Sequence, residues 1–148
     1  SPISIVKLEL SFKNSKTIRD ILVLILNIFQ TPSIWKNRFI IIIDELINNS
    51  IEHWSIEWDI NKVVFFIKKE ENKIHITLEV KDTWKKHNIT AQEMESLQEE
   101  KSKINFLKHN SIRWRWLFLI IKNLVDKIYF KDREDWWLTV WIEKTLDI

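Results

Sequence analysis

The hydrophobic pattern in the first third of the chain predicts one strand and two helices. Apolar and polar residues alternate from Ile5 to Phe12 with one slip, which is typical of a strand that buries one face. Ser15 is a suitable N-cap for a helix that runs to about Gln30. The Thr-Pro-Ser sequence at 31–33 interrupts the helical pattern, and a second helix is predicted to reach roughly His53.

The rest of the chain predicts four more strands and one more helix. β-branched and aromatic residues dominate two runs joined by a short charged turn, as expected for a strand pair. A polar stretch from about residue 98 to 110 predicts a loop or a flexible lid. In chain order, the two strands, the helix and the last two strands are predicted at 63–68, 74–80, 117–125, 128–131 and 138–144. This alternation predicts a single α/β (α+β) domain, residues 1–148, built as a two-layer sandwich of helices on one face of a mixed sheet.

One feature of the composition changes how these segments are interpreted, because the chain contains no glycine and nine tryptophans. Average glycine usage of about 7% would give roughly ten glycines in a chain of this length. We therefore hypothesise that the gene uses UGA for glycine and that UGA has been translated as tryptophan. TGG codons in the native gene would rule this out. The positions concerned are Trp35, Trp54, Trp58, Trp84, Trp114, Trp116, Trp136, Trp137 and Trp141.

Charge and cysteine content argue against several classes of function. The chain has 23 basic and 21 acidic residues, a formal net charge of +2 and no long block of one sign, so binding to nucleic acid or to a membrane surface has little electrostatic support. The lack of cysteine excludes a disulfide framework and a thiolate metal site. No hydrophobic segment approaches the ~20 residues of a membrane span, and the N-terminus lacks a signal-peptide pattern. We expect a soluble, cytoplasmic protein.

The first candidate site lies on the second predicted helix. Glu45, Asn49 and His53 are spaced four residues apart, so they line one stripe of that helix. A polar stripe of this kind is more often the solvated face of an amphipathic helix. The alternative interpretation is a functional site with a carboxylate, an amide and an imidazole on one face of the helix.

Three further segments contain tryptophans that the recoding hypothesis converts to glycine. Asp82 ends an apolar strand and is followed by Trp84, although a strand that ends in Asp is more often an ordinary turn. Residues 113–117 become Arg-Gly-Arg-Gly-Leu at the start of a helix. As written, the same residues form a Trp/Arg segment of the kind that contacts membranes or nucleic acid. The last segment becomes Asp-Gly-Gly before Leu138 and Thr139.

Taken together and in this order, the four segments resemble the nucleotide-binding motifs of serine-kinase anti-sigma factors. These belong to the GHKL ATPase superfamily of gyrase and sensor histidine kinases, and the resemblance covers nearly the whole chain. It implies a Bergerat-type fold in which ATP lies between the helix layer and a lid at about residues 98–116.

The resemblance also implies a role for each motif residue. Glu45 corresponds to the catalytic base, and Asn49 to the residue that binds Mg²⁺ beside the phosphates of ATP. Asp82 corresponds to the carboxylate that accepts a hydrogen bond from the adenine amino group. The remaining nucleotide contacts fall on His53, Trp84, Arg113, Trp114, Arg115, Trp116, Leu117 and Thr139.

The function implied is an ATP- and Mg²⁺-dependent protein serine kinase. Members of the family phosphorylate a small antagonist protein and alternately sequester a sigma factor, usually as homodimers. Two alternatives remain: the ATP-binding domain of a sensor histidine kinase or other multidomain regulator, and a non-catalytic module that binds a partner. Only 44 residues precede Glu45, and they begin with a predicted strand, which favours the first interpretation over the sensor kinase.

The tryptophans themselves predict a defect in the chain as written. An indole ring at Trp84, Trp114 or Trp116 would occupy space where the backbone must approach the nucleotide. We expect this chain to keep the fold but to bind ATP poorly or not at all, whereas a glycine-restored form should bind and react.

Overall fold

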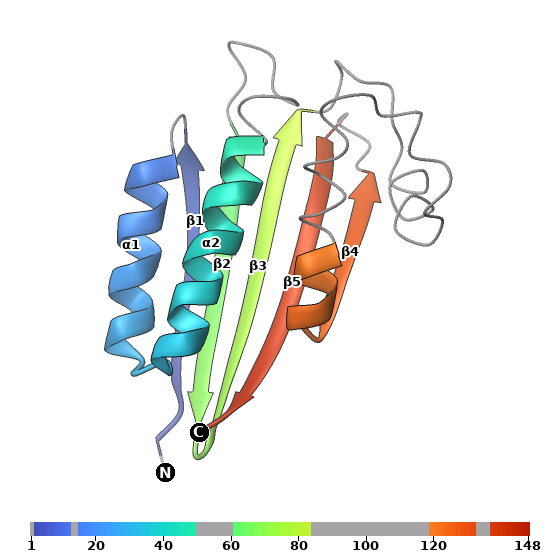
Figure 1. The fold of residues 1–148 in the computed structure, drawn as a ribbon. Coiled ribbons are helices and arrows are strands. Elements are labelled where there is room, and N and C mark those ends of the chain that lie inside the picture. Colours follow the sequence, from blue (N-terminus) through green and yellow to red (C-terminus); the bar gives the residue numbers. More distant parts are fainter. Residues whose placement is uncertain (1, 13–14, 50–60, 84–118, 133–136) are drawn as a thin grey trace.

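The computed structural model describes residues 2–12, 15–49, 61–83, 119–132 and 137–148. These residues form five strands and two long helices (Figure 1), and residues 119–124 form a further short helix. In chain order the elements are β1 (Ser4–Phe12), α1 (Ser15–Ile28), α2 (Ser33–Asn49), β2 (Asn61–Glu70), β3 (Lys73–Thr83), β4 (Lys127–Asp132) and β5 (Trp137–Asp147).

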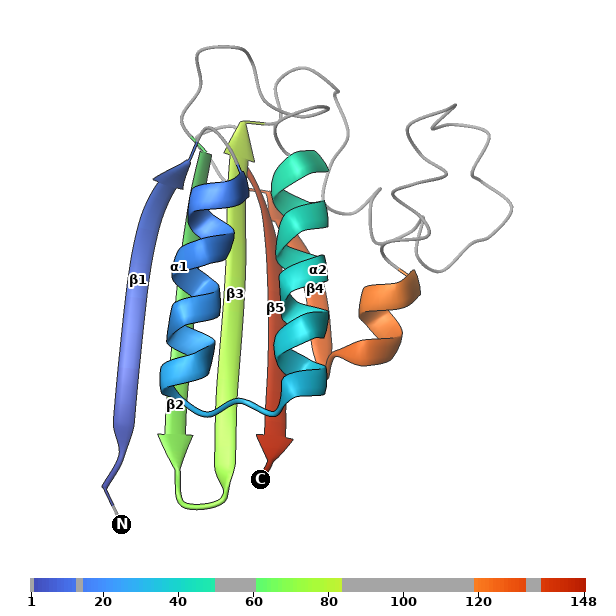
Figure 2. The same cartoon turned by 60° about the vertical axis from the view of Figure 1, so that its left-hand side comes forward.

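The five strands form one sheet in the order β1-β2-β3-β5-β4, and every neighbouring pair is antiparallel. The mixed sheet expected from the sequence is therefore wrong for the described residues. The physical reason lies between β1 and β2, where two antiparallel helices intervene (Figure 2). A single crossover helix would return the chain parallel to β1, but the second helix reverses it again.

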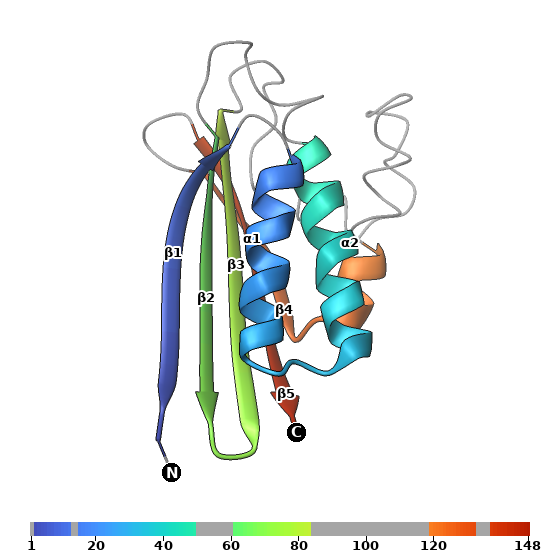
Figure 3. The same cartoon turned by 90° about the vertical axis from the view of Figure 1, so that its left-hand side faces the viewer.

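Both long helices cover the same face of the sheet (Figure 3). Each helix buries an apolar stripe at helical spacing, and the strands bury alternate residues beneath it. The completely buried side chains include two phenylalanines, Phe39 of α2 and Phe65 of β2. The helices and strands share one core, which contains Ile18, Leu22, Leu26, Phe39, Ile42, Ile43, Leu46, Ile47, Val63, Phe65, Ile67, Ile74, Ile76, Leu78, Val80, Ile121, Val140 and Ile142.

Strand alternation gives the sheet a second face, opposite α1 and α2, which we call the outer face. On β3, the core residues Ile74, Ile76, Leu78 and Val80 alternate with half-buried polar residues. The outer face therefore carries His75, Thr77, Glu79 and Lys81 from β3, with Thr139, Trp141, Glu143 and Thr145 from β5 and Lys127 and Tyr129 from β4.

Two described residues adopt left-handed backbone conformations without being glycine. Gln30 has φ of 55° and Glu71 has φ of 48°. Gln30 lies just beyond the C-terminus of α1, where Thr31 N donates to Leu26 O and Gln30 N donates to Asn27 O, both at 3.0 Å, the pair of bonds that defines a Schellman cap. Neither left-handed residue is a tryptophan, although left-handed sites are where glycine is most favoured.

The predicted helices and strands are confirmed within a few residues at each end wherever the structure describes them. The second helix is described as far as Asn49, and the predicted lid at 98–116 lies outside the described residues. The extent of the domain and the Bergerat-type assignment stay predictions. Among the described residues, no helix combines the length and apolar character needed to cross a bilayer.

Candidate functional site

The topology brings several of the predicted site residues to one end of the domain. α2 ends at Asn49, β3 ends just after Asp82, and β5 begins just before Thr139. All three termini lie at the upper end in Figure 1, opposite the β2–β3 turn. The remaining predicted contacts, His53, Trp84, Arg113, Trp114, Arg115, Trp116 and Leu117, lie outside the described residues.

An ion pair between the two helices holds the last turns of α2 in place. Arg19 Nη1 of α1 donates to Asp44 Oδ2 at 3.1 Å, and both side chains are partly buried. The other carboxylate oxygen, Asp44 Oδ1, is buried and has no hydrogen-bond partner among the described residues. Glu45 follows directly on α2 and is half-buried. This ion pair links α1 to the helix that carries Glu45 and Asn49.

The central strand pair positions the other two predicted residues. Asp82 is paired with Leu138 and Lys81 with Thr139 in the β3–β5 register, so Asp82 and Thr139 are one position apart across the ladder. Thr139 alternates with Val140 of the core, which places it on the outer face. The strand register thus gives no support for a contact between Thr139 and a nucleotide beneath the helices.

Thr139 is nevertheless an unusual side chain. It is only 2% exposed, and within the part of the chain that the structure describes its hydroxyl oxygen has no hydrogen-bond partner. A buried hydroxyl without a partner costs about 1–3 kcal/mol. No metal cluster accompanies it, since the described residues contain no group of three or more His, Asp or Glu side chains that could hold an ion.

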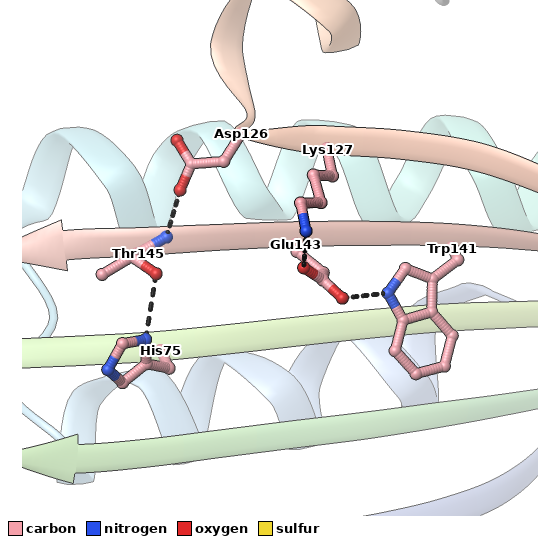
Figure 4. A network of polar contacts seen from close by, with 6 residues as sticks. All are labelled: His75, Asp126, Lys127, Trp141, Glu143 and Thr145. Atoms are coloured by element: carbon pink, nitrogen blue, oxygen red, sulfur yellow. Dashed lines mark hydrogen bonds and ion pairs between the residues drawn. The ribbon is translucent and has the colours of Figure 1, made fainter.

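A polar network on the outer face was not anticipated from the sequence (Figure 4). Trp141 Nε1 donates to Glu143 Oε1 at 2.8 Å, and Lys127 Nζ lies 3.8 Å from Glu143 Oε2. The Trp141 ring stacks on Tyr129, with 5.8 Å between centroids and 17° between planes. Register explains these contacts, because Lys127 is paired with Glu143 and Tyr129 with Trp141.

Further polar contacts lie toward the C-terminal end of β5. His75 Nδ1 and the hydroxyl of Thr145 form a hydrogen bond of 2.9 Å across directly paired positions. The backbone N–H of Thr145 donates to Asp126 Oδ2 at 2.7 Å, and Lys144 Nζ donates to Asp126 Oδ1 at 3.2 Å. Asp126 therefore ties the start of β4 to the end of β5 (Figure 4).

Two pKa values respond to this arrangement. Burial raises the pKa of Asp126, but the hydrogen bonds from Thr145 N–H and Lys144 and the charge of Lys144 outweigh it, so this pKa is lowered overall. The pKa of the Tyr129 phenol is raised by desolvation and then by the carboxylates of Glu143 and Glu79. Tyr129 therefore stays a neutral donor over a wider pH range.

Comparison with known proteins supplies a likeness of fold. No protein-family model matches the chain, and no curated protein matches it. A chain in the crystal structure of the SiaB–SiaC complex from Pseudomonas aeruginosa is similar, with a TM-score of 0.52 over 94% of this chain and 89% of that chain. The sequences are 12% identical, so the likeness is one of fold.

These findings overturn the assignment to the serine-kinase anti-sigma family of the GHKL superfamily. The similar structure is a chain of the SiaB–SiaC complex, no family model supports the motif match, and the sheet is antiparallel throughout the described residues. The motifs misled because each is short, and all four matched in full only when a tryptophan was taken as glycine. The family therefore gives no support to the roles of Glu45, Asn49 and Asp82.

Proposed function

We propose that this chain is a regulatory module that acts by binding a protein partner, and that Mg²⁺-ATP controls the interaction. The observation that carries the proposal is the likeness, over nearly the full length of both chains, to a protein crystallised in complex with another protein. A fold retained at 12% identity is compatible with many activities, so the control by nucleotide is argued from the residues themselves.

The nucleotide part of the proposal rests on the end of the domain where α2 and β3 terminate. Glu45 and Asn49 occupy successive turns of one helix, and Asp82 lies near the end of the central strand. An amide oxygen is a hard ligand that suits Mg²⁺, and a carboxylate close to a phosphoryl group can take a proton from an attacking hydroxyl. We assign Asn49 to Mg²⁺, Glu45 to the general base and Asp82 to the adenine amino group.

The corresponding reaction is phosphoryl transfer from ATP to a serine of the partner. The serine oxygen would bond to the γ-phosphorus while the bond to the β-bridging oxygen breaks, Glu45 would accept the serine proton, and ADP would leave. Transfer of this kind changes the partner's charge by about −2 at neutral pH. A change of this size can disrupt one interface or create another, which is how the module would switch between proteins.

Calorimetric titration with ATP, in Mg²⁺ and then in EDTA, tests the nucleotide site. The chain as written and a form with glycine at all nine tryptophan positions should be compared, and the glycine form is expected to bind more tightly. In the glycine form, Asn49→Ala should weaken binding only when Mg²⁺ is present. Asn37→Ala, at an exposed position of the same helix, is the matched control. Equal affinity with and without Mg²⁺ in both variants would remove Asn49 from this role.

Transfer itself is tested with γ-labelled ATP and the purified products of the genes that neighbour this one. Glu45→Ala should retain nucleotide binding and lower the rate of labelling by roughly 10²–10⁴-fold. Binding of a neighbouring gene product without any labelling would instead identify a non-catalytic partner-binding module.

A further inference from the structure

The helix layer carries large apolar side chains that are exposed to solvent. They lie on α1 and α2, and their exposed fractions range from 57% to 66%: Leu24, Ile28, Ile34 and Ile41. Single exposed apolar residues are ordinary on a protein surface, whereas a contiguous group of them marks an interaction site. The way the two helices face one another decides whether these residues form such a group.

Two polar contacts show which sides of the helices meet. Lys36 Nζ of α2 donates to Asn27 Oδ1 of α1 at 3.1 Å. The ion pair of Arg19 with Asp44 lies eight residues away along each helix. Residues four apart on a helix share one side of it, so a single stripe of α1 faces a single stripe of α2 along their antiparallel contact (Figure 2).

The middle of this contact is apolar. Val23 of α1 and Ile40 of α2 lie midway between the two polar contacts, and both are half-buried. The residues that follow them, Leu24 and Ile41, are each 60% exposed, because the next residue on a helix is turned by about 100°. These four residues form an apolar strip that crosses both helices, which we call the helix strip.

The helix strip continues toward the turn between α1 and α2. Ile28 lies one turn beyond Leu24 on α1, and Ile34 lies about two turns before Ile41 on α2. The apolar residues of α2 therefore extend over roughly 10 Å of the helix surface. This length suits a partner helix that places apolar residues at positions i, i+3 or i+4, and i+7.

The charges beside the helix strip are unevenly distributed. Between Asp20 and Asp44 the chain contains no acidic residue, and its only charged residues there are Lys36 and Arg38. Both lie in the first two turns of α2. Lys69 Nζ of β2 donates to a backbone carbonyl just beyond α1 at 3.4 Å, so it adds a third basic group at this end. A partner that covers the strip would be favoured by acidic residues here.

The opposite end of the helix layer decides between a protein and a membrane as the occupant. Apolar and basic residues together are also found on surfaces that bind anionic lipids. The charges of the opposite end are mixed, and they come from Lys16, Arg19, Asp20, Asp44 and Glu45. An anionic membrane would repel these carboxylates, whereas a protein helix can carry different charges at its two ends.

We propose that the helix strip binds an amphipathic helix of a partner protein, with acidic residues at the end that lies over Lys36 and Arg38. The inference rests on the proposed function, because it names the kind of partner that the module binds. It also suggests a link to the nucleotide, since α2 contributes to the strip and carries Glu45 and Asn49 near its end.

Fluorescence anisotropy with two labelled peptides tests the charge preference. Both peptides are amphipathic helices of about 15 residues with leucine at the apolar positions, and their polar positions hold glutamate and glutamine in one and lysine and glutamine in the other. The acidic peptide should bind about tenfold more tightly. Lys36→Glu combined with Arg38→Glu should reverse this preference. Lys7→Glu, at an exposed position on the outer face, is the control and should preserve it.

Substitutions within the helix strip test the apolar contacts. Leu24→Gln and Ile41→Gln should each weaken binding of the acidic peptide by about tenfold. Ile5→Gln, at a position of β1 that is similarly exposed at 57%, is the matched control and should bind as the unmodified chain does. Urea denaturation checks that the variants stay folded. The proposal is overturned if the acidic peptide does not bind, if both peptides bind equally, or if the two strip variants bind unchanged.

Two further measurements separate this inference from its alternatives. Binding to vesicles of phosphatidylserine and phosphatidylcholine, without binding to the acidic peptide, would assign the strip to a membrane and overturn the proposal. A neighbouring gene product that binds equally well to the unmodified chain, Leu24→Gln and Ile41→Gln would support the proposed function but exclude the helix strip as its site. Strip-dependent binding of the acidic peptide, with no neighbouring product bound, would count against the proposed function alone.

Discussion

The two faces of the sheet share the same strands and the same backbone hydrogen bonds, yet different interactions stabilise them. Beneath the helices, the described strands contribute aliphatic and aromatic side chains that are almost completely buried. On the outer face the contacts are individual cross-strand pairs, such as Trp141 with Tyr129 and His75 with Thr145. Stability should therefore come mainly from the inner face, because apolar burial contributes more free energy than exposed polar pairs do.

Adjacent phenylalanines on β2 provide the strongest test of this difference. Phe65 is completely buried under the helices, and Phe66 is half-buried on the outer face. Phe65→Ala should lower the free energy of unfolding by about 3–5 kcal/mol, because it leaves a cavity in the core. Phe66→Ala should lower it by only about 1 kcal/mol. Urea denaturation of both variants measures the two values, and similar losses would show that the faces have been assigned wrongly.

A smaller effect is expected for Trp141, the main aromatic residue of the outer network. Trp141→Gly removes the stack on Tyr129 and the hydrogen bond to Glu143, and it places glycine inside a strand. These losses together should lower the free energy of unfolding by about 2 kcal/mol.

The control for this substitution is Trp141→Phe, which keeps an aromatic ring against Tyr129 and should cost less than the glycine variant. The comparison also bears on recoding, because glycine is the natural residue at this position if UGA encodes it. A glycine variant as stable as the chain as written would show that the outer aromatic stack contributes little.

The smallest effect concerns Asp126 and acid. Its pKa is lowered in the folded state, so the folded protein favours the carboxylate, and this stabilisation is present above the unfolded pKa of about 3.9 and lost as the pH falls through the folded value. Asp126→Asn should remove this part of the pH dependence. The change should not exceed about 0.5 kcal/mol, because solvent screens an exposed group.

Thermal melts between neutral pH and about pH 3 can detect the difference. Asp147→Asn, at an exposed position of β5, should follow the unmodified chain. If Asp126→Asn loses as much stability on acidification as the unmodified chain does, the bonds from Thr145 and Lys144 do not stabilise the carboxylate.

Much of the fold could be predicted because alternation and helical spacing are local properties. The run Ile74 to Val80 predicted β3 from its period of two, and the structure confirms that strand. The direction of the strands could not be obtained in this way, because it depends on which distant segments are neighbours in the sheet. The polar network of the outer face could not be predicted from the sequence either, since the pairing of His75 with Thr145 depends on the register between distant segments.

The candidate site was less predictable, since it was assembled from short motifs. Glu45 and Asn49 do lie on one helix end near the terminus of β3, but the family that gave them roles was wrong. One of the nine tryptophans makes contacts that depend on its ring. Trp35 lies in the first turn of α2 with Lys144 Nζ 4.4 Å and Arg38 4.8 Å from its ring, contacts that a glycine would not make.

The order of the strands also has a consequence for how the chain folds. β2 and β3 are joined by a two-residue turn, so this hairpin needs little loop closure and can form within microseconds. The pairing of β3 with β5 joins segments that are far apart in sequence, with Thr83 opposite Trp137. Closing so long a loop lowers the conformational entropy of the chain before the contacts between β3 and β5 can stabilise it. Docking of the β4–β5 unit onto β3 is therefore expected to limit the folding rate. Before this step, the β2–β3 hairpin would have one side of β3 unpaired.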